Sequence, residues 1–185
     1  MMRELADNIL DIAQNSISAG ASLTEITVRI SHEENLVSIV FKDDGCGMEP
    51  EFVKAVTQPF TTTRKTRKVG LGLPLLHMTA NMTGGNFAIE SEVGKGTMVS
   101  ASFGLDHIDR PPLGDVSGAW FTLVFMNPDT DFLFVYDVDG RCFEFDTRVI
   151  RETIAPLALN EPEIAAWIRE CISQEITQLH GGTFQ

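Results

Sequence analysis

The sequence predicts a two-layer α/β (α+β) sandwich in which helices cover one face of a mixed or antiparallel sheet. Apolar residues recur at helical spacing in two segments, 2–19 and about 71–82. Each of these segments is followed by two β-rich runs joined by a short polar or glycine-containing turn. A helix–hairpin unit that occurs twice in this way places one layer of helices on one sheet.

The first helix and hairpin have clear boundaries. Residues 2–19 form the helix, which Gly20 ends as a glycine just after a helix does. Its apolar face is formed by Leu5, Ile9, Ile12 and Ile17. The runs 24–31 and 35–42 then predict a hairpin.

The second unit starts with a connection. Pro50 opens a short helix to about Val56, because proline is favoured in the first turn of a helix. Residues 57–70 are polar, basic and threonine-rich and predict a loop. The helix at 71–82 and strands at 86–92 and 97–103 complete the unit.

The remaining residues predict a small α+β extension. Residues 105–115 form a rigid connector, and we expect strands at 117–126, 131–137 and 141–146 with an Asp-Gly turn before the last. A terminal helix is predicted over 161–179. The domain organisation is therefore a first domain at 1–104, the connector at 105–115, and an acidic α+β extension at 116–185.

Composition and charge exclude some functions. With 185 residues, of which 43% are hydrophobic and 22% charged, the chain is typical of a globular protein. The net charge is −12, of which −3 falls on residues 1–104 and −9 on residues 105–185. So acidic a chain repels phosphates, and we expect no nucleic-acid binding. Basic residues are concentrated only between two glycine motifs, where we expect them to contact phosphate: Arg64, Lys65, Arg67 and Lys68.

The sequence also predicts a cytoplasmic protein that does not enter a membrane. Its apolar stretches are too short to cross a bilayer, and its N-terminus has no signal-peptide pattern. Its three cysteines, Cys46, Cys142 and Cys171, have no metal-ligand spacing and are expected to be reduced.

Four short motifs occur in a fixed order at the junctions of the predicted elements. They are Asn15-Ser-Ile-Ser-Ala-Gly-Ala21, Asp43-Asp-Gly-Cys-Gly47, Val69-Gly-Leu-Gly-Leu73 and Gly94-Lys-Gly-Thr97. Each alone is a weak signal. Together they resemble the GHKL group of ATP-binding domains, found in gyrase, MutL, histidine kinases and anti-sigma-factor kinases. The resemblance covers about residues 4–104 and implies the Bergerat fold.

The resemblance implies an adenine pocket around Asp43. A carboxylate at the end of a strand can accept a hydrogen bond from the exocyclic amine of adenine and reject bases that lack it. Gly45 and Gly47 permit the turn and leave room for the purine. Thr97 is expected to hold a water molecule beside Asp43. We expect the same pocket to be lined by Ala19, Met48 and Phe60.

The resemblance also implies sites for phosphate and magnesium. Gly70, Leu71, Gly72 and Leu73 form the glycine motif before the second helix, where backbone N–H groups can bind phosphate oxygens. The segment Thr61-Thr62-Thr63-Arg64-Lys65 is similar to the ATP lid. Asn15 corresponds to the single protein ligand of Mg²⁺, a metal that prefers oxygen ligands and keeps phosphate and water ligands.

Asp11 is the candidate catalytic residue. It lies four residues before Asn15 and therefore on the same helix face. Gyrase-like and MutL-like relatives have a glutamate there that polarises the attacking water. Asp11 keeps the carboxylate but is one methylene shorter, so slow hydrolysis is expected. Glu4 and Asn8 have the same spacing and provide an alternative pair.

Two functions follow from the resemblance. The pattern of residues 69–73 and 86–97 is more similar to histidine kinases than to gyrase, which favours phosphotransfer from ATP–Mg²⁺ to a separate protein. The four histidines lack the context of a phosphoacceptor, and we expect no acceptor helix before the first motif. The alternative is a non-catalytic ATP/ADP sensor whose lid orders on binding and whose extension signals to a partner. A slow ATPase is less favoured, since residues 105–185 show no counterpart of the gyrase and MutL transducer.

The partner can be described only by class. We expect a protein, either a phosphoacceptor or a regulated complex. The segment Asp106-His-Ile-Asp-Arg-Pro-Pro-Leu-Gly-Asp115 also resembles stand-alone ATP-binding proteins of anaerobic bacteria whose genes neighbour iron-hydrogenase or NADH-oxidoreductase subunits. This resemblance implies a redox or hydrogenase complex as the partner.

Overall fold

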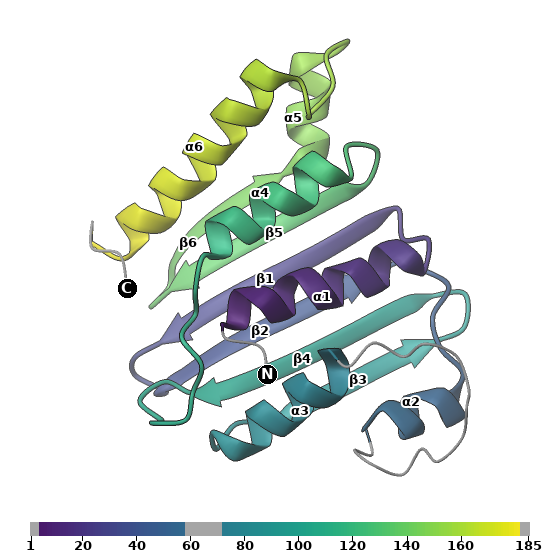
Figure 1. The fold of residues 1–185 in the computed structure, drawn as a ribbon, viewed down its shortest axis with the longest axis vertical. Helices are drawn as coiled ribbons and strands as arrows, with labels where there is room; N and C mark the ends of the chain where they lie inside the picture. Colours follow the sequence, from purple (N-terminus) through teal and green to yellow (C-terminus); the bar gives the residue numbers. More distant parts are fainter. Residues whose placement is uncertain (1–3, 58–71, 182–185) are drawn as a thin grey trace.

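The computed structural model describes residues 4–57 and 72–181 and contains one continuous sheet with helices packed on it (Figure 1). The elements in chain order are α1 (Leu5–Ser18), β1 (Leu23–Ser31), β2 (Leu36–Asp43), α2 (Pro50–Thr57), α3 (Gly72–Met82), β3 (Phe87–Glu92), β4 (Gly96–Gly104), α4 (Val116–Met126), β5 (Asp131–Val138), β6 (Arg141–Asp146), α5 (Thr147–Ile154) and α6 (Pro162–Leu179).

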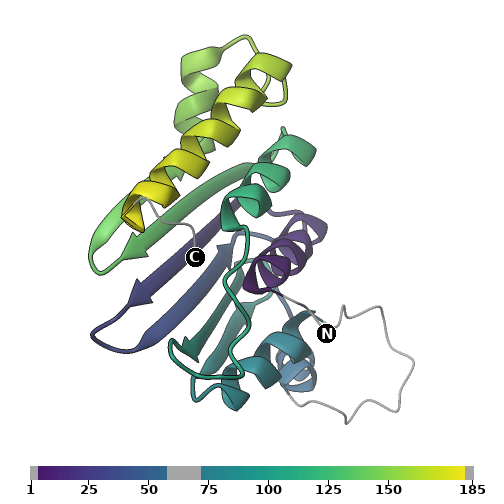
Figure 2. The same cartoon turned by 60° about the vertical axis from the view of Figure 1, so that its left-hand side comes forward.

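The six strands lie in the order β3-β4-β2-β1-β5-β6. All neighbouring pairs are antiparallel except β1 and β5, which run parallel. Helices α1, α3, α4 and α6 lie on one face of this sheet (Figures 1 and 2). The predicted two-layer sandwich with a mixed sheet is therefore confirmed.

The core lies between the sheet and this helical layer. Along β1, buried Ile26, Val28 and Ile30 alternate with the more exposed Thr27 and Arg29, as expected for a strand with one covered face. The buried face of α1 is built from residues at helical spacing, including Leu5, Ile9 and Ile12. Burial of these side chains fixes the helix on the sheet and so fixes the position of the polar residues on its other faces.

Most predicted elements of the first 104 residues are confirmed within one or two residues, but the predicted strand at 117–126 is wrong. This segment is helix α4. Its valine, phenylalanine and threonine content favours a strand, yet its buried residues have helical spacing: Val116, Ala119, Trp120, Leu123 and Val124. Asp115 accepts a hydrogen bond from the Gly118 N–H at 2.8 Å and caps the helix.

Helix α5 was not predicted from the sequence. It begins directly after β6, where the Asp146 carboxylate accepts a hydrogen bond from the Arg148 N–H at 2.9 Å. The strands at 131–138 and 141–146 and the terminal helix are confirmed.

The connector and the extension are joined closely to the first half of the chain. The carbonyl groups of Pro112 and Leu113 accept hydrogen bonds from the first free N–H groups of α1, those of Leu5 and Ala6, each at 2.9 Å. Strand β5 pairs with β1 over eight residues. The extension therefore shares the sheet of the first half, while the predicted division into domains stays a prediction.

Within the residues that the structure describes, every helix is too short or too polar to cross a membrane. The cytoplasmic location stays a prediction.

Candidate functional site

Asp43 lies at the last position of β2, under the C-terminal half of α1. Its Oδ2 accepts a hydrogen bond from the Ser16 hydroxyl at 2.7 Å, and its Oδ1 accepts one from the Gly45 N–H at 3.0 Å. Ser16 is only 3% exposed. Two donors on different elements therefore fix the orientation of this half-buried carboxylate, and its remaining lone pairs stay available to a ligand.

A row of polar side chains continues from Asp43 across the sheet. Asp43 is paired with Thr97 on β4, and Thr97 is paired with Ser91 on β3. The hydroxyl oxygens of Thr97 and Ser91 are 2.9 Å apart, and the Met48 N–H donates to the Ser91 hydroxyl at 2.8 Å. The structure thus places Thr97 beside Asp43 and the Met48 backbone beside Ser91, while the roles of Thr97 and Met48 in an adenine pocket stay predictions.

The glycine turn after β2 is closely packed against the turn before β4. Gly47 has φ +67°, and a Cβ there would overlap the carbonyl oxygen of Glu92. Gly96 has φ +106°, and a Cβ there would overlap the carbonyl oxygen of Asp43. The backbone of Ala19 also meets this turn, since its carbonyl accepts from the Cys46 N–H at 2.9 Å.

Helix α1 presents Asp11 and Asn15 on its exposed surface. The start of α3 lies against Asp11, because a Cβ built on Gly72 would be 3.4 Å from Asp11 Oδ2. The alternative pair is arranged differently. Asn8 is only 3% exposed, and its amide donates to the Glu4 carbonyl of its own helix at 3.4 Å. This geometry favours the Asp11–Asn15 pair.

A magnesium site would need donors from the nucleotide. Among residues 4–57 and 72–181, no three His, Cys, Asp or Glu side chains are arranged to hold a metal ion. Asn15 offers one exposed carbonyl oxygen, which fits an ion that takes its other ligands from phosphate and water. The role of Asn15 stays a prediction.

Part of the predicted phosphate site lies outside the described residues. This part comprises Thr61, Thr62, Thr63, Arg64, Lys65, Arg67, Lys68, Gly70 and Leu71, and Phe60 of the predicted adenine pocket lies outside the described residues as well. Of the glycine motif, Gly72 is the first residue of α3, and Leu73 is buried in the core. Gly72 therefore places the N-terminus of α3 beside Asp11, where a carboxylate is favoured.

Sequence reasoning missed two residues of this site, Ser16 and Ser91. Ser16 follows Ile9 and Ile12 on the buried face of α1, and Ser91 follows Phe87 and Ile89 on the inner face of β3. A polar residue on an otherwise apolar face indicates a buried hydrogen bond. This signal was present in the sequence.

Asp44 supports the site from the other side of the turn. Its carboxylate accepts hydrogen bonds from the backbone N–H groups of Ser22 and Leu23 at 2.8 and 3.0 Å. Burial raises the pKa of Asp44, but these hydrogen bonds outweigh it and hold the pKa below its ordinary value. Asp44 thus holds the start of β1, whereas Asp43 faces the candidate site.

The four histidines lie away from this cluster. His32 contacts Asp139 at 2.7 Å, His77 stacks on Phe87, and Tyr136 bonds His180 at 2.8 Å. His107 accepts a hydrogen bond from the Asp109 N–H at 3.2 Å, within the segment between β4 and α4.

Comparison with known proteins places the chain in a family. A family model described as histidine kinase-, DNA gyrase B-, and HSP90-like ATPase matches residues 1–107, more than half of the chain. The chain belongs to this ATPase family. The matched part is an ATP-binding, kinase-like domain with the expected Bergerat-like fold.

Individual relatives agree with this assignment. The histidine protein kinase DivJ of Caulobacter vibrioides is 30% identical over 102 residues, which are 53% of this chain and 17% of that protein. Sporulation kinase C of Bacillus subtilis is 33% identical over 95 residues, which are 51% of this chain and 22% of that protein. The ATPase chain thus spans about a fifth of the length of these relatives.

A solved structure shares the fold over nearly the whole chain. It is the N-terminal domain of a DNA repair protein, with 13% identity and a TM-score of 0.52, and the match covers 96% of this chain and 57% of that one. At this identity the likeness shows the fold alone.

Proposed function

We propose that this ATPase domain binds ATP–Mg²⁺ and transfers the γ-phosphoryl group to a separate partner protein. Asp43 recognises adenine, Asn15 contributes an oxygen to Mg²⁺, and Asp11 orients or deprotonates the attacking group. The histidine kinases among its relatives support a kinase-like reaction.

The single observation that supports this proposal best is the fixed Asp43 carboxylate. Its two donors, Ser16 and the Gly45 N–H, come from α1 and from the glycine turn. A preorganised acceptor needs no reorganisation when the exocyclic amine of adenine arrives, and a base without that donor leaves the carboxylate unpaired.

A second candidate function is an ATP/ADP sensor without phosphotransfer. The observation that favours it is Asp11 itself, since its carboxylate lies against Gly72 and is one methylene shorter than the glutamate of hydrolytic relatives. A carboxylate held there can stabilise the start of α3 without reaching a substrate. Slow hydrolysis is an intermediate case.

The deciding experiment follows γ-labelled ATP with Mg²⁺. Free phosphate and protein-bound label are measured with the full chain alone and with cell extract, for the wild type and for Asp11→Asn. Asp7→Asn is the matched control, because Asp7 is an exposed aspartate on the same helix one turn earlier.

Label that appears on a partner and is lost in Asp11→Asn alone supports the kinase. ATP binding with neither free phosphate nor transferred label supports the sensor. Free phosphate without label on any protein supports the slow ATPase. Failure to bind ATP at all would overturn every form of the proposal.

A further inference from the structure

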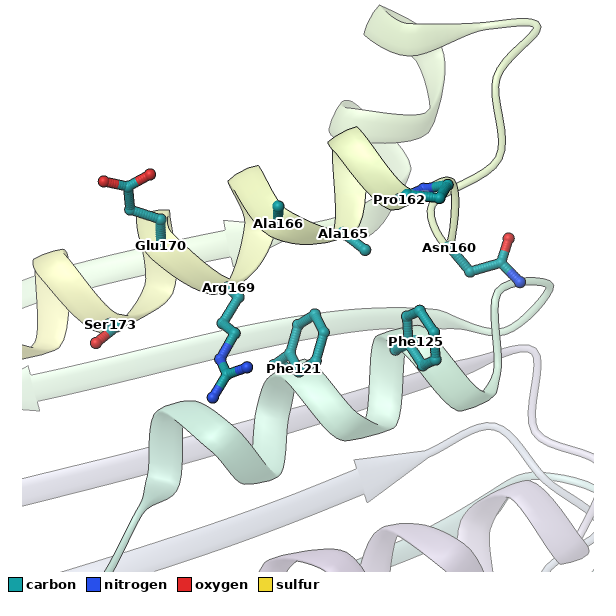
Figure 3. A pocket seen from close by; sticks show the side chains of 9 residues that line it. All are labelled: Phe121, Phe125, Asn160, Pro162, Ala165, Ala166, Arg169, Glu170 and Ser173. Carbon is teal, nitrogen blue, oxygen red and sulfur yellow. The ribbon is translucent and has the colours of Figure 1, made fainter.

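Helices α4 and α6 enclose an open apolar groove that the nucleotide site does not use. Figure 3 shows Phe121 and Phe125 of α4 projecting toward the small side chains of α6. The groove has a volume of about 580 Å³. It is lined by Phe121, Phe125, Asn160, Pro162, Ala165, Ala166, Arg169, Glu170 and Ser173. None of these residues belongs to the site around Asp43.

Helix α4 is apolar on all sides, although only one side is packed in the core. Trp120 and Leu123 are buried on the inner side, where Trp120 stacks on Phe134 with ring centroids 4.6 Å apart. On the outer side Phe125 is 41% and Met126 68% exposed. A helix that is apolar all round is typical of one covered on all sides. The outer side therefore indicates an interaction surface.

The shape of the groove fits an α-helix. Its α6 wall consists of residues spaced three or four apart from Pro162 to Ser173, a stretch of about 17 Å or three helical turns. Ala165 and Ala166 keep this wall low, while the rings of Phe121 and Phe125 stack at 5.6 Å and form the opposite wall. A small compact ligand would fill only part of such a length.

The charge around the groove favours a basic partner helix. Glu161 and Glu163 flank Pro162 and are exposed, and Glu170 lines the groove itself. Residues 105–185 have a net charge of −9. Arg169 lies over the ring of Phe121, with its guanidinium carbon 5.6 Å from the ring centroid. Two copies of this acidic surface repel each other, whereas a basic segment is attracted.

We propose that the α4–α6 groove binds an amphipathic helix of a partner protein. The apolar side of that helix packs on Phe121 and Phe125, and lysine or arginine residues on its flanks pair with the glutamates of α6. This is the helix-in-groove mode of recognition, in which apolar residues at i, i+3, i+4 and i+7 are the anchors. The proposal does not depend on phosphotransfer.

The test uses a labelled synthetic helical peptide of about 18 residues, with leucine and phenylalanine on one stripe and lysine on both flanks. Fluorescence anisotropy measures its binding to the full-length wild type, to Phe125→Asp and to Ala166→Trp, which fills the groove. Val149→Asp is the matched control, because Val149 is an exposed apolar residue of α5 outside the groove. A second peptide has glutamate in place of lysine.

We expect binding that falls about tenfold or more in Phe125→Asp and Ala166→Trp, as for central anchors of an interface. Val149→Asp and Asp43→Asn should bind the peptide like the wild type, and the glutamate peptide should bind more weakly. ATP binding retained by Phe125→Asp shows that this variant is folded. Equal binding of the peptide to all variants, equal binding of both peptides, no binding, or a wild-type dimer dissociated by Phe125→Asp would each overturn the proposal.

Discussion

The Ser16 hydroxyl of α1 donates a hydrogen bond of 2.7 Å to Asp43 Oδ2 at the end of β2. This bond joins the helix that bears Asp11 and Asn15 to the strand that bears Asp43, the carboxylate proposed to recognise adenine. The buried Ser16 hydroxyl therefore adds a direct polar link between the two parts of the candidate site to the apolar packing of α1 on the sheet.

Ser16→Ala should weaken ATP binding by about 1–2 kcal/mol, because the Asp43 carboxylate loses a buried donor and its fixed orientation. Isothermal titration calorimetry measures the change. The control is Ser18→Ala on the same helix, whose exposed hydroxyl donates to the Gln14 carbonyl at 2.7 Å. Equal ATP affinity in both variants would show that Ser16 does not position Asp43.

Asp43→Asn should cost more, roughly 2–4 kcal/mol of ATP affinity, because an amide cannot accept from Ser16, from Gly45 and from adenine together. Asp44→Asn tests the neighbouring carboxylate, which bonds Ser22 and Leu23 instead. We expect this second variant to lower the free energy of unfolding while ATP affinity is retained. Wild-type ATP affinity in Asp43→Asn would contradict the site assignment.

Asn15→Ala should remove the Mg²⁺ dependence of ATP binding and leave a weaker, metal-independent affinity. Because Asn15 is exposed, the free energy of unfolding of the Asn15→Ala variant should differ from that of the wild type by less than about 0.5 kcal/mol. Asn8→Ala provides the comparison and should instead destabilise the fold, since Asn8 is buried. An unchanged Mg²⁺ dependence in Asn15→Ala would move the ligand assignment to Asn8.

Gly47→Ala should destabilise the protein by about 1–3 kcal/mol, the cost of strain at a positive φ together with overlap on the Glu92 carbonyl. Gly94→Ala measures the cost of a positive φ alone, so the difference between the two variants gives the cost of the overlap. Gly94 has a similar φ of +78°, but a Cβ there meets nothing within 4 Å. Urea unfolding of the two variants should show the greater loss for Gly47→Ala, and equal losses would mean that the close approach has no energetic consequence.

The stability of the extension should depend on pH through His180. Burial lowers the pKa of His180 below its ordinary value of 6.5, and the nearby Arg141 and His32 lower it further. A lowered pKa in the folded state means that the unfolded chain binds the proton more tightly. The contribution of His180 is therefore fully present above pH 6.5 and is lost as the pH falls through the folded pKa.

Urea unfolding of the wild type and His180→Gln at pH 7.5 and pH 5 tests this dependence. The wild type should lose more stability between the two pH values than the variant does. Identical losses would show that the bond between Tyr136 and His180 is insensitive to the protonation of the imidazole.

The nucleotide-binding half of the fold was predictable because its signals are local. The alternation of Ile26, Val28 and Ile30 with polar neighbours marks a strand, and Gly20 marks the end of α1. The order of the four motifs then indicated Asn15 and Asp43 as site residues, and helical spacing from Asn15 indicated Asp11. Asp43 lies at the end of β2, whereas Asp11 and Asn15 lie on the exposed face of α1 at the four-residue spacing of one helical turn.

The extension was less predictable because α4 gives contradictory signals. Its valine and aromatic residues favour a strand, and its apolar character all round hides the helical period. Trp120 packs against Phe134, which lies 14 positions later in the chain, and this long-range contact favours the helix. The parallel pairing of β5 with β1 is likewise a long-range feature, which no local pattern of Leu23–Ser31 could indicate.

That parallel pairing gives the extension a protective role. Strand β1 has β2 on one side and β5 on the other, so loss of residues 105–185 would turn β1 into an edge strand with a row of unsatisfied backbone groups. The same loss would uncap the N-terminus of α1, since Pro112 and Leu113 would be gone. A chain shortened after residue 104 should therefore aggregate by strand addition, and its nucleotide chemistry is best measured on all 185 residues.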